Sequence, residues 1–153
     1  MLDFALQFVG LFCVGLAAGI TVCVLLMERV FSGSGQFFTE WMQLMVRALT
    51  GPGPALGVLS MVAMAADASG LFKRGGGVPF WLCVGALALN LVALALTRLG
   101  HFPINDVIAT WNPSSPPPDW AEVHARWTGF HVGRTASVVG SFSLYLWRVL
   151  LKS

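Results

Sequence analysis

The sequence predicts an all-α integral membrane protein: a four-helix bundle with a kinked second helix and an amphipathic extension before the last span. Of its 153 residues, 56% are hydrophobic and only 10% are charged, whereas a soluble domain of this size carries about 25% charged residues. The mean hydropathy is +0.75, and several apolar runs are long enough to cross a bilayer. No internal repeat or soluble domain is visible, so we expect residues 1–153 to form a single transmembrane domain.

Charge and cysteine content exclude two further classes. The formal net charge of +2 is too small and too scattered for nucleic-acid binding, which needs a clustered basic face. The cysteines are odd in number, lie inside apolar runs and form no CxxC motif. Cys13 and Cys23 are separated by roughly 15 Å along one predicted helix, so they cannot form a disulfide. We expect all the cysteines, Cys83 included, to be buried thiols.

Three of the four spans are plain from the apolar runs. The first, Phe4–Met27, contains Gln7 as its only strongly polar residue, and it exceeds the roughly 30 Å hydrocarbon core of a bilayer. A basic segment is missing before it, so a cleavable signal peptide is not predicted. The third span runs from about Val78 to Leu99 and the fourth from about Gly129 to Leu151.

The second span needs a kink. Its uninterrupted apolar sequence covers only Ala55–Ala66, which is short for a crossing. A helix that begins near Phe37 and passes through Gly51–Pro54 is long enough, but its prolines bend it. We therefore predict a kinked second helix.

Four crossings place both termini on one side of the membrane. Only Lys and Arg in short connections decide which side that is, and their numbers on the two sides nearly tie. The positive residues on the side of the termini lie in a tight hairpin and at a span end, so we expect both termini in the cytoplasm and the chain in the inner membrane, in contact with lipid. The residues counted are Lys73, Arg74, Arg148 and Lys152 against Arg29, Arg47, Arg98 and Arg126.

Polar residues recur at helical spacing inside the spans, where each one is costly and calls for a partner or a task. The first span carries Gln7, Thr21 and Glu28 on one face. It also contains Gly15 and Gly19, a GxxxG pair that permits close helix contact. An ordinary packing seam is the alternative explanation of this face. The third span places Asn90, Thr97 and His101 on one stripe.

The last span has the most informative stripe. Asp119, followed by Glu122, is typical of a capping box that opens a helix. The next stripe residues follow at spacings of 4, 3, 4 and 3 and fall within an arc of roughly 80°. An aromatic belt at the membrane interface explains the tryptophans but not the deeper ionisable residues. The stripe consists of Trp120, His124, Trp127, His131 and Arg134.

We expect these stripes to converge on a pocket in the outer half of the bundle. As partner of Glu28 we expect Arg134 or Arg47. A metal is not predicted, because His124 and His131 lie seven residues apart and no HExxH motif is present; a haem on either histidine remains an alternative. The residues predicted to bound the pocket are Glu28, His101, Asn105, Trp127, His131 and Arg134, with His124 beside them.

Two stretches of the C-terminal half resemble the anthrone oxygenase-like family of small four-span membrane proteins. They are Pro103-Ile104-Asn105-Asp106 and Trp127-x3-His131-x2-Arg134-Thr135. The length, the glycine-rich first span and the kinked second span also fit. The resemblance implies a cofactor-independent monooxygenase that uses O2 on an anthrone-type phenol, as in aromatic polyketide pathways.

Under that resemblance the site residues take roles. An anthrone that loses a proton becomes an electron-rich anion that donates an electron to O2. His131 would be the base, since an imidazole exchanges protons near neutral pH, and Arg134 would stabilise the developing negative charge. Trp127 would stack on the flat substrate, and Asn105 would hydrogen-bond it or else hold the loop. His124, His101 and Glu28 would complete the substrate site.

A non-enzymatic role is the opposing hypothesis. The chain would then be an accessory subunit of a larger membrane complex, a homo-oligomer or a small carrier, and the GxxxG pair and the aromatic face would serve packing. A channel is disfavoured, because no span carries a regular polar lining. Co-purification with a partner would favour the subunit, and binding of a hydrophobic aromatic by the isolated protein would favour the enzyme.

Overall fold

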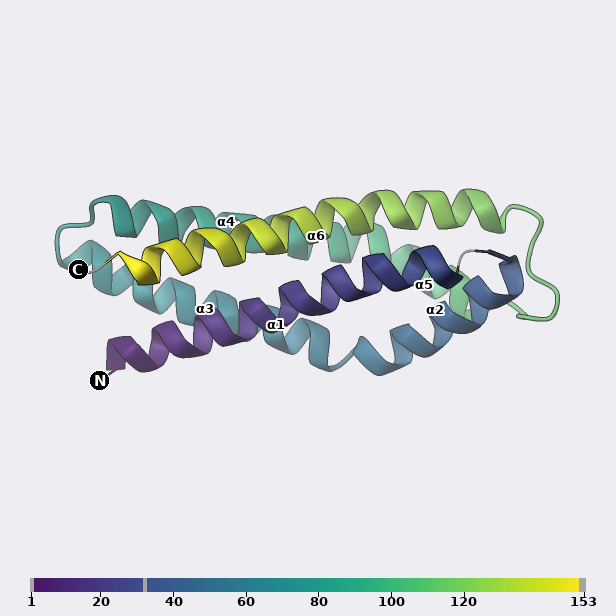
Figure 1. The fold of residues 1–153 in the computed structure, drawn as a ribbon, viewed down its shortest axis with the longest axis horizontal. Coiled ribbons are helices and arrows are strands. Elements are labelled where there is room, and N and C mark those ends of the chain that lie inside the picture. The colour runs from purple at the N-terminus through teal and green to yellow at the C-terminus, as the bar shows by residue number, and fades with distance from the viewer. Residues whose placement is uncertain (1, 32, 152–153) are drawn as a thin grey trace.

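The computed structural model describes residues 2–31 and 33–151, and the described chain is helical without any strand. The long helices form an elongated bundle, as predicted, and both ends of the chain lie at the same end of it (Figure 1). The helices are α1 (Leu2–Phe31), α2 (Gly35–Leu49), α3 (Pro52–Lys73), α4 (Val78–Leu96), the π-helical turn η1 (Thr97–His101), α5 (Phe102–Ala109) and α6 (Trp120–Leu150).

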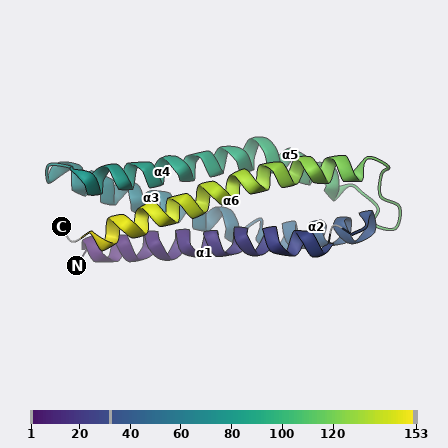
Figure 2. The same cartoon turned by 45° about the horizontal axis from the view of Figure 1, so that its top comes forward.

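Helix α6 is the central packing partner. It lies along α4 and α1, while α3 packs against α1 and α4. The short helices α2 and α5 pack on each other at the end of the bundle away from the termini (Figure 2). Polar residues that would be costly toward lipid can therefore face one another between these helices.

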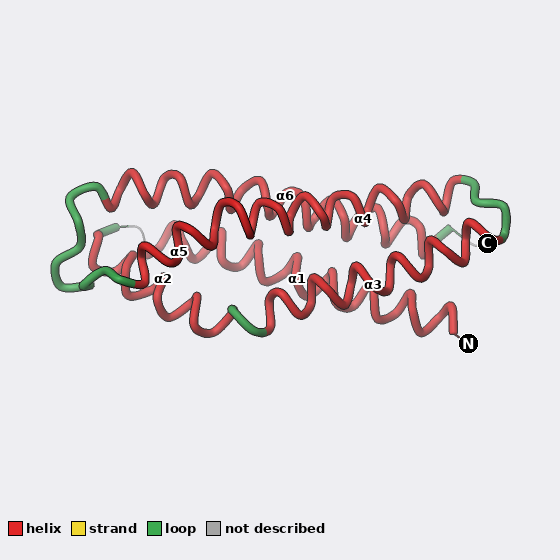
Figure 3. The backbone as a smooth tube through the Cα atoms, turned by 180° about the vertical axis from the view of Figure 1, so that it is seen from behind, coloured by secondary structure: helices red, strands yellow, loops and turns green. Residues whose placement is uncertain are grey.

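The predicted kink separates α2 from α3. The chain between them, Thr50–Gly51, is a turn (Figure 3), because Pro52 and Pro54 lack the N–H groups that would continue the helical hydrogen bonds. The location of the bend is as predicted, but the helix is interrupted rather than bent. Gln43 of α2 donates to the carbonyl oxygens of Ile108 and Trp111 at 3.1 and 3.0 Å, which ties α2 to the end of α5.

The third span continues further than predicted. After α4 the chain stays helical through η1 and α5 to Ala109, so the expected long connection 100–127 is wrong for its first ten residues. The π-helical turn adds a residue to the helix and brings it close to α6: a Cβ atom at Gly100 would lie 2.4 Å from the Phe130 ring. Single π turns occur inside α-helices, frequently at functional sites.

Two predicted helix ends are confirmed with one correction. The hairpin between α3 and α4 uses Gly75, Gly76 and Gly77, all at positive φ, where glycine is free of the steric cost of a Cβ. Helix α6 begins next to Asp119, as predicted. The side chain of Asp119 makes no capping hydrogen bond, however, so the expected capping box is not formed.

Of the predicted small-residue pair of α1, Gly15 is confirmed as a close contact and Gly19 is not. Gly19 has nothing within 4 Å of an added Cβ and faces no neighbouring helix. The close contacts are at Gly10 and Gly15, where added Cβ atoms would lie 2.8 Å from Tyr145 and 3.2 Å from Phe142 of α6. Of the cysteines, Cys13 and Cys83 are buried as expected, but Cys23 is exposed.

Three helical stretches of the described chain are long and apolar enough to cross a membrane: Asp3–Phe31, Pro52–Lys73 and Val78–Ala109. Their outward surfaces carry large apolar side chains such as Val62 and Leu99, which are 61% and 79% exposed. Such surfaces suit contact with lipid. Helix α6 has 31 residues and is long enough to cross as well. Its polar stripe lowers its mean hydropathy, and it is not one of these three stretches.

A buried ion pair joins α3 to α6 near the termini. The Nε and Nη2 atoms of Arg148 each lie 2.8 Å from an oxygen of the Asp67 carboxylate, and both residues are 2% exposed. The Tyr145 hydroxyl donates to the same carboxylate at 3.4 Å. Arg148 was counted above as a positive charge at the membrane surface. The structure corrects this, because the side chain of Arg148 is buried in an ion pair inside the bundle and is not exposed at its surface.

Candidate functional site

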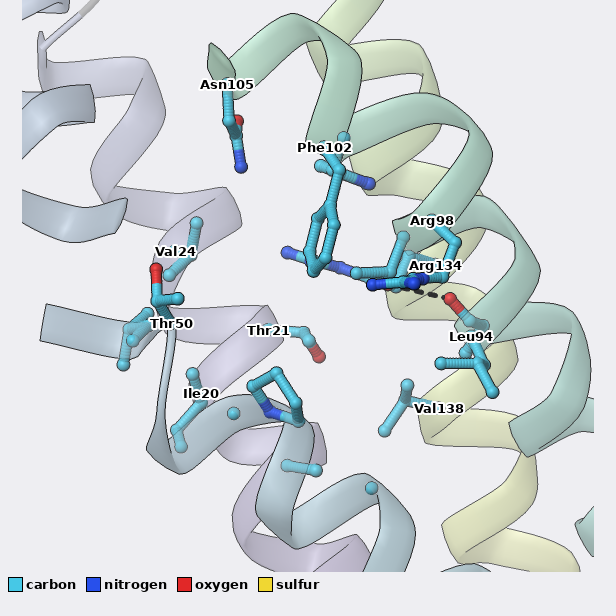
Figure 4. A pocket seen from close by; sticks show the side chains of 18 of the residues that line it. Ile20, Thr21, Val24, Thr50, Leu94, Arg98, Phe102, Asn105, Arg134 and Val138 are labelled. Atoms are coloured by element: carbon cyan, nitrogen blue, oxygen red, sulfur yellow. Dashed lines mark hydrogen bonds between the residues drawn. The ribbon is translucent and has the colours of Figure 1, made fainter. Parts of the chain in front are cut away.

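A cavity of about 370 Å³ lies between α1, the α2–α3 break, the α4–η1–α5 rod and α6. Arg98 and Arg134 lie on one side of it, and Val24 and Thr50 lie across from them (Figure 4). The described residues that line it are mostly apolar and include no Asp or Glu. Its polar lining consists of Thr21, Thr50, Asn90, Thr97, Arg98, His101, Asn105, Trp127 and Arg134.

His101 lines this cavity from the π-helical turn, with 1% of its surface exposed. Its Nδ1 atom lies 3.2 Å from the carbonyl oxygen of Leu96. A carbonyl only accepts hydrogen bonds, so Nδ1 carries the proton and Nε2 carries the lone pair. Nε2 is buried and has no hydrogen-bond partner within the described part of the chain. The cavity wall therefore includes an imidazole whose basic nitrogen has no protein partner in the described part of the chain.

His131 of α6 is completely buried, with 0% of its surface exposed, and both of its ring nitrogens have hydrogen-bond partners. Nε2 lies 3.0 Å from the carbonyl oxygen of Thr21, to which it donates. Nδ1 lies 2.8 Å from Nη2 of Arg134 and must accept, because a guanidinium only donates. His131 is thus a neutral imidazole held in one orientation. It does not line the cavity.

Arg134 presents its guanidinium to the cavity without a carboxylate partner. Its Nη2 atom donates a hydrogen bond to His131, and its buried Nε atom has no partner among the described residues. A buried cation without an anion is unfavourable. A ligand that carries negative charge, or develops it, would supply the missing partner.

Trp127 and Asn105 line the cavity on the side that lies toward the end of the bundle away from the termini. The indole N–H of Trp127 donates to Oδ1 of Asn105 at 3.0 Å. Its ring stacks on His131, with centroids 4.7 Å apart and planes inclined by 17°, and His101 meets it edge-on at 5.2 Å. One face of the indole is therefore already covered by protein, and none of the described residues accepts a hydrogen bond from the amide N–H groups of Asn105.

Glu28 belongs to a second cluster, outside the cavity lining. Its Oε1 atom lies 2.7 Å from Nε2 of His124 and also accepts from the Thr128 hydroxyl. The expectation that Glu28 pairs with Arg134 or Arg47 is thus wrong. The carboxylate joins α1 to α6 nearer the outer end of the bundle, where His124 packs edge-on against Phe38 with centroids 4.7 Å apart.

The predicted site residues therefore separate into two groups. Four of them line the cavity together: His101, Asn105, Trp127 and Arg134. His131 stands directly behind them, whereas Glu28 and His124 do not reach the cavity. Sequence reasoning missed Arg98, which was counted only as a surface charge. Its position three residues before His101, on the same helical face, is the signal that could have placed it there.

No group of three or more His, Cys, Asp or Glu side chains among the described residues is arranged to hold a metal ion. The expectation that the protein works without metal or haem stays a prediction.

These features define a class of protein: a helical membrane protein with an apolar internal cavity, lined by a histidine with a free ring nitrogen and by an arginine that has no carboxylate partner among the described residues. Residues 41–144 match the family model described as anthrone oxygenase. The match covers more than half of the chain, from α2 into α6, and includes Asn105 and Trp127 of the cavity wall. The chain belongs to the anthrone oxygenase family, as its C-terminal motifs predicted. No curated protein and no solved structure matches it.

Proposed function

We propose that this protein is a membrane-embedded oxygenase that converts a hydrophobic anthrone-type phenol with O2 inside the cavity, without a cofactor. One observation carries the proposal: the same apolar cavity is lined by His101, whose Nε2 has no partner among the described residues, and by Arg134, whose guanidinium has no carboxylate partner among them. A base and a cation in a low-dielectric cavity are what the formation of a carbanion or phenolate requires.

The reaction balances with these groups alone. His101 Nε2 takes a proton from the central methylene of the anthrone, and Arg134 stabilises the resulting enolate oxygen. The anion transfers one electron to O2, and the radical pair forms a carbon–oxygen bond to give a peroxide anion. The peroxide takes the proton back from His101 and loses water. The net change is anthrone plus O2 to anthraquinone plus water.

His101 replaces His131 as the base in this proposal. The lone pair of His131 is occupied by Arg134, and its N–H is bound to Thr21, so it has no free site for a substrate proton. His131 is instead a positioning residue, which holds Arg134 through Nδ1. Asn105 is a substrate-binding residue through its amide N–H groups, and Trp127 shapes the cavity wall.

We further propose four membrane crossings with both termini in the cytoplasm. Helix α6 lies along α1 and α4, and both of these are apolar enough to span. A helix packed between two spanning helices shares their depth, even though its own polar stripe faces inward. The orientation is supported by Lys73 and Arg74 in the hairpin beside the termini.

The test is O2 consumption by purified protein in lipid nanodiscs with 1,8-dihydroxyanthrone as substrate. Formation of the anthraquinone is followed by absorbance, and empty nanodiscs give the rate of autoxidation. We expect His101→Asn to lower the protein-dependent rate by about 10²-fold or more, because general-base catalysis is lost. Ser143→Ala, at an exposed position on α6, is the matched control and keeps the rate.

A wild-type rate no greater than that of empty nanodiscs, with this substrate and related anthrones, would overturn the oxygenase proposal. A protein that purifies only with a partner chain and binds no aromatic ligand would favour the accessory subunit instead. If His101→Asn keeps the full rate while Arg134→Gln loses it, the enzyme stands but its base lies elsewhere.

A further inference from the structure

We infer that the cavity opens sideways into the bilayer and admits an aromatic acid from the membrane, with Arg98 at the mouth binding its carboxylate. This inference rests on the proposed function only in taking the cavity as the place of reaction. It adds an entry route and a charged group on the ligand.

The lining shows where the cavity opens. Its deep wall is buried: Asn90 is 5% and His101 is 1% exposed. Its exposed lining residues fall on two lips. One lip is the α2–α3 break with the start of α3, where Val58 is 50% exposed, and the other is the end of α4, where Leu94 is 40% exposed. The mouth therefore lies between α3 and the α4–η1 rod, on the flank of the bundle.

Both lips lie at the same depth in the membrane. Helix α3 has 22 residues between Pro52 and Lys73, about 33 Å at 1.5 Å per residue, which matches the roughly 30 Å hydrocarbon core. The lip at Val58 is thus close to the outer edge of that core. Leu94 and Arg98 lie roughly 24–30 Å along the rod from its start at Val78, near the same edge.

The charge at the mouth selects the ligand. The Cζ atom of Arg98 lies 5.1 Å from the centre of the Phe102 ring, and the side chain forms no ion pair within the described residues. An aromatic acid at this depth keeps its ring among the acyl chains and its carboxylate near the headgroups. Its ring can enter between the lips while the carboxylate meets the guanidinium, an interaction stronger than a neutral hydrogen bond.

The mouth also has room that a side chain could fill. Gly57 of α3 lines the cavity, and an added Cβ would meet nothing within 4 Å. Replacing this helical glycine favours the helix, so Gly57→Leu narrows the mouth without a steric clash at Cβ. Gly19 of α1 is also helical and free of neighbours, but it does not line the cavity. Gly19→Leu is therefore a matched control.

Binding is measured in nanodiscs by energy transfer from tryptophan to two probes of similar shape, anthracene-9-carboxylate and the neutral 9-methylanthracene. We expect Arg98→Gln to weaken binding of the carboxylate by about 10- to 100-fold and to leave the methyl probe unchanged. Gly57→Leu should weaken both probes and Gly19→Leu neither. If Gly57→Leu does not fold, Val58→Trp at the same lip replaces it.

Two binding results would overturn the inference. One is that Arg98→Gln weakens the binding of both probes equally, and the other is that Gly57→Leu binds both probes as tightly as the wild type. Because binding needs neither O2 nor turnover, a protein that binds as expected but forms no anthraquinone counts against the proposed function alone.

The direction of the mouth is tested by a cysteine at its lip. Leu94→Cys is made in a Cys23→Ser background, since Cys13 and Cys83 are buried. We expect labelling by the lipid-soluble pyrenyl maleimide, protection by anthracene-9-carboxylate, and little labelling by a charged, water-borne methanethiosulfonate. Labelling by the charged reagent at the same rate would mean that the mouth opens to water, and would overturn entry from the bilayer.

Discussion

Removing Arg148 should destabilise the protein more than any other single loss of charge. Arg148 and Asp67 are each 2% exposed and meet through two contacts of 2.8 Å. Arg148→Met would leave the Asp67 carboxylate buried with only the Tyr145 hydroxyl beside it. Breaking a buried pair by removing one partner costs about 3–5 kcal/mol, since the remaining charge is uncompensated.

That cost is large enough to read from thermal unfolding. For a chain of this size 1 kcal/mol lowers Tm by about 2–4 °C, so the variant should melt roughly 6–20 °C below wild type. The assay is near-ultraviolet circular dichroism of the protein in one detergent. The double variant Asp67→Leu/Arg148→Met should recover most of the loss, because an apolar pair of similar volume replaces a buried ion pair at little cost.

The exposed pair at the same end of the bundle is the control. Arg74 and Asp3 lie 2.9 Å apart, but their side chains are 51% and 58% exposed, so Arg74→Met should cost at most about 1 kcal/mol. If Arg148→Met lowers Tm no more than Arg74→Met does, the reasoning fails. A double variant as unstable as the single one would show that packing, not charge, is at stake.

Two further changes test the packing around the site. Gly100→Ala should lose about 1–3 kcal/mol of stability, because its Cβ would lie 2.4 Å from the Phe130 ring. The control Gly19→Ala should not lower Tm. Equal Tm values for the two variants would contradict the close approach of η1 to α6. Glu28→Ala should cost about 1–3 kcal/mol by leaving His124 without its acceptor, yet keep anthrone turnover. Loss of turnover in a protein that melts normally would place Glu28 in the cavity after all.

The sequence predicted the stripes well, because the side chains on one face of a helix follow from spacing alone. Trp127, His131 and Arg134 had to share a face of any helix that contains them, and an ionisable face inside a membrane turns inward. The helical register thus placed Trp127 and His131 in the interior, where the structure has them at 1% and 0% exposure.

The same reasoning could not predict which side chains pair between helices, since this depends on how far one helix is shifted along another. Glu28 meets His124, not Arg134, because of the axial position of α1 against α6. Asp67 and Arg148 lie 81 residues apart in sequence, and no local pattern pairs them. The π-helical turn Thr97–His101 adds a residue to an otherwise regular helix, and no pattern of spacing in the sequence marks it.

The two histidines of the site can be told apart by a double-mutant cycle with Arg134. If His131 acts only by holding Arg134 through Nδ1, His131→Asn should lower kcat/KM in the wild type but add little once Arg134→Gln is present. If His131 were the base instead, its Nδ1 lone pair would be free in the Arg134→Gln background. His131→Asn should then still lower kcat/KM by about 10²-fold or more in that background. We expect this second pattern for His101→Asn, whose Nε2 is free of Arg134 from the start. The measurement is anthrone turnover by the four proteins of each cycle, with circular dichroism to show that each is folded. Independent, multiplicative losses from His131→Asn and Arg134→Gln would refute the positioning role and return His131 to the reaction itself.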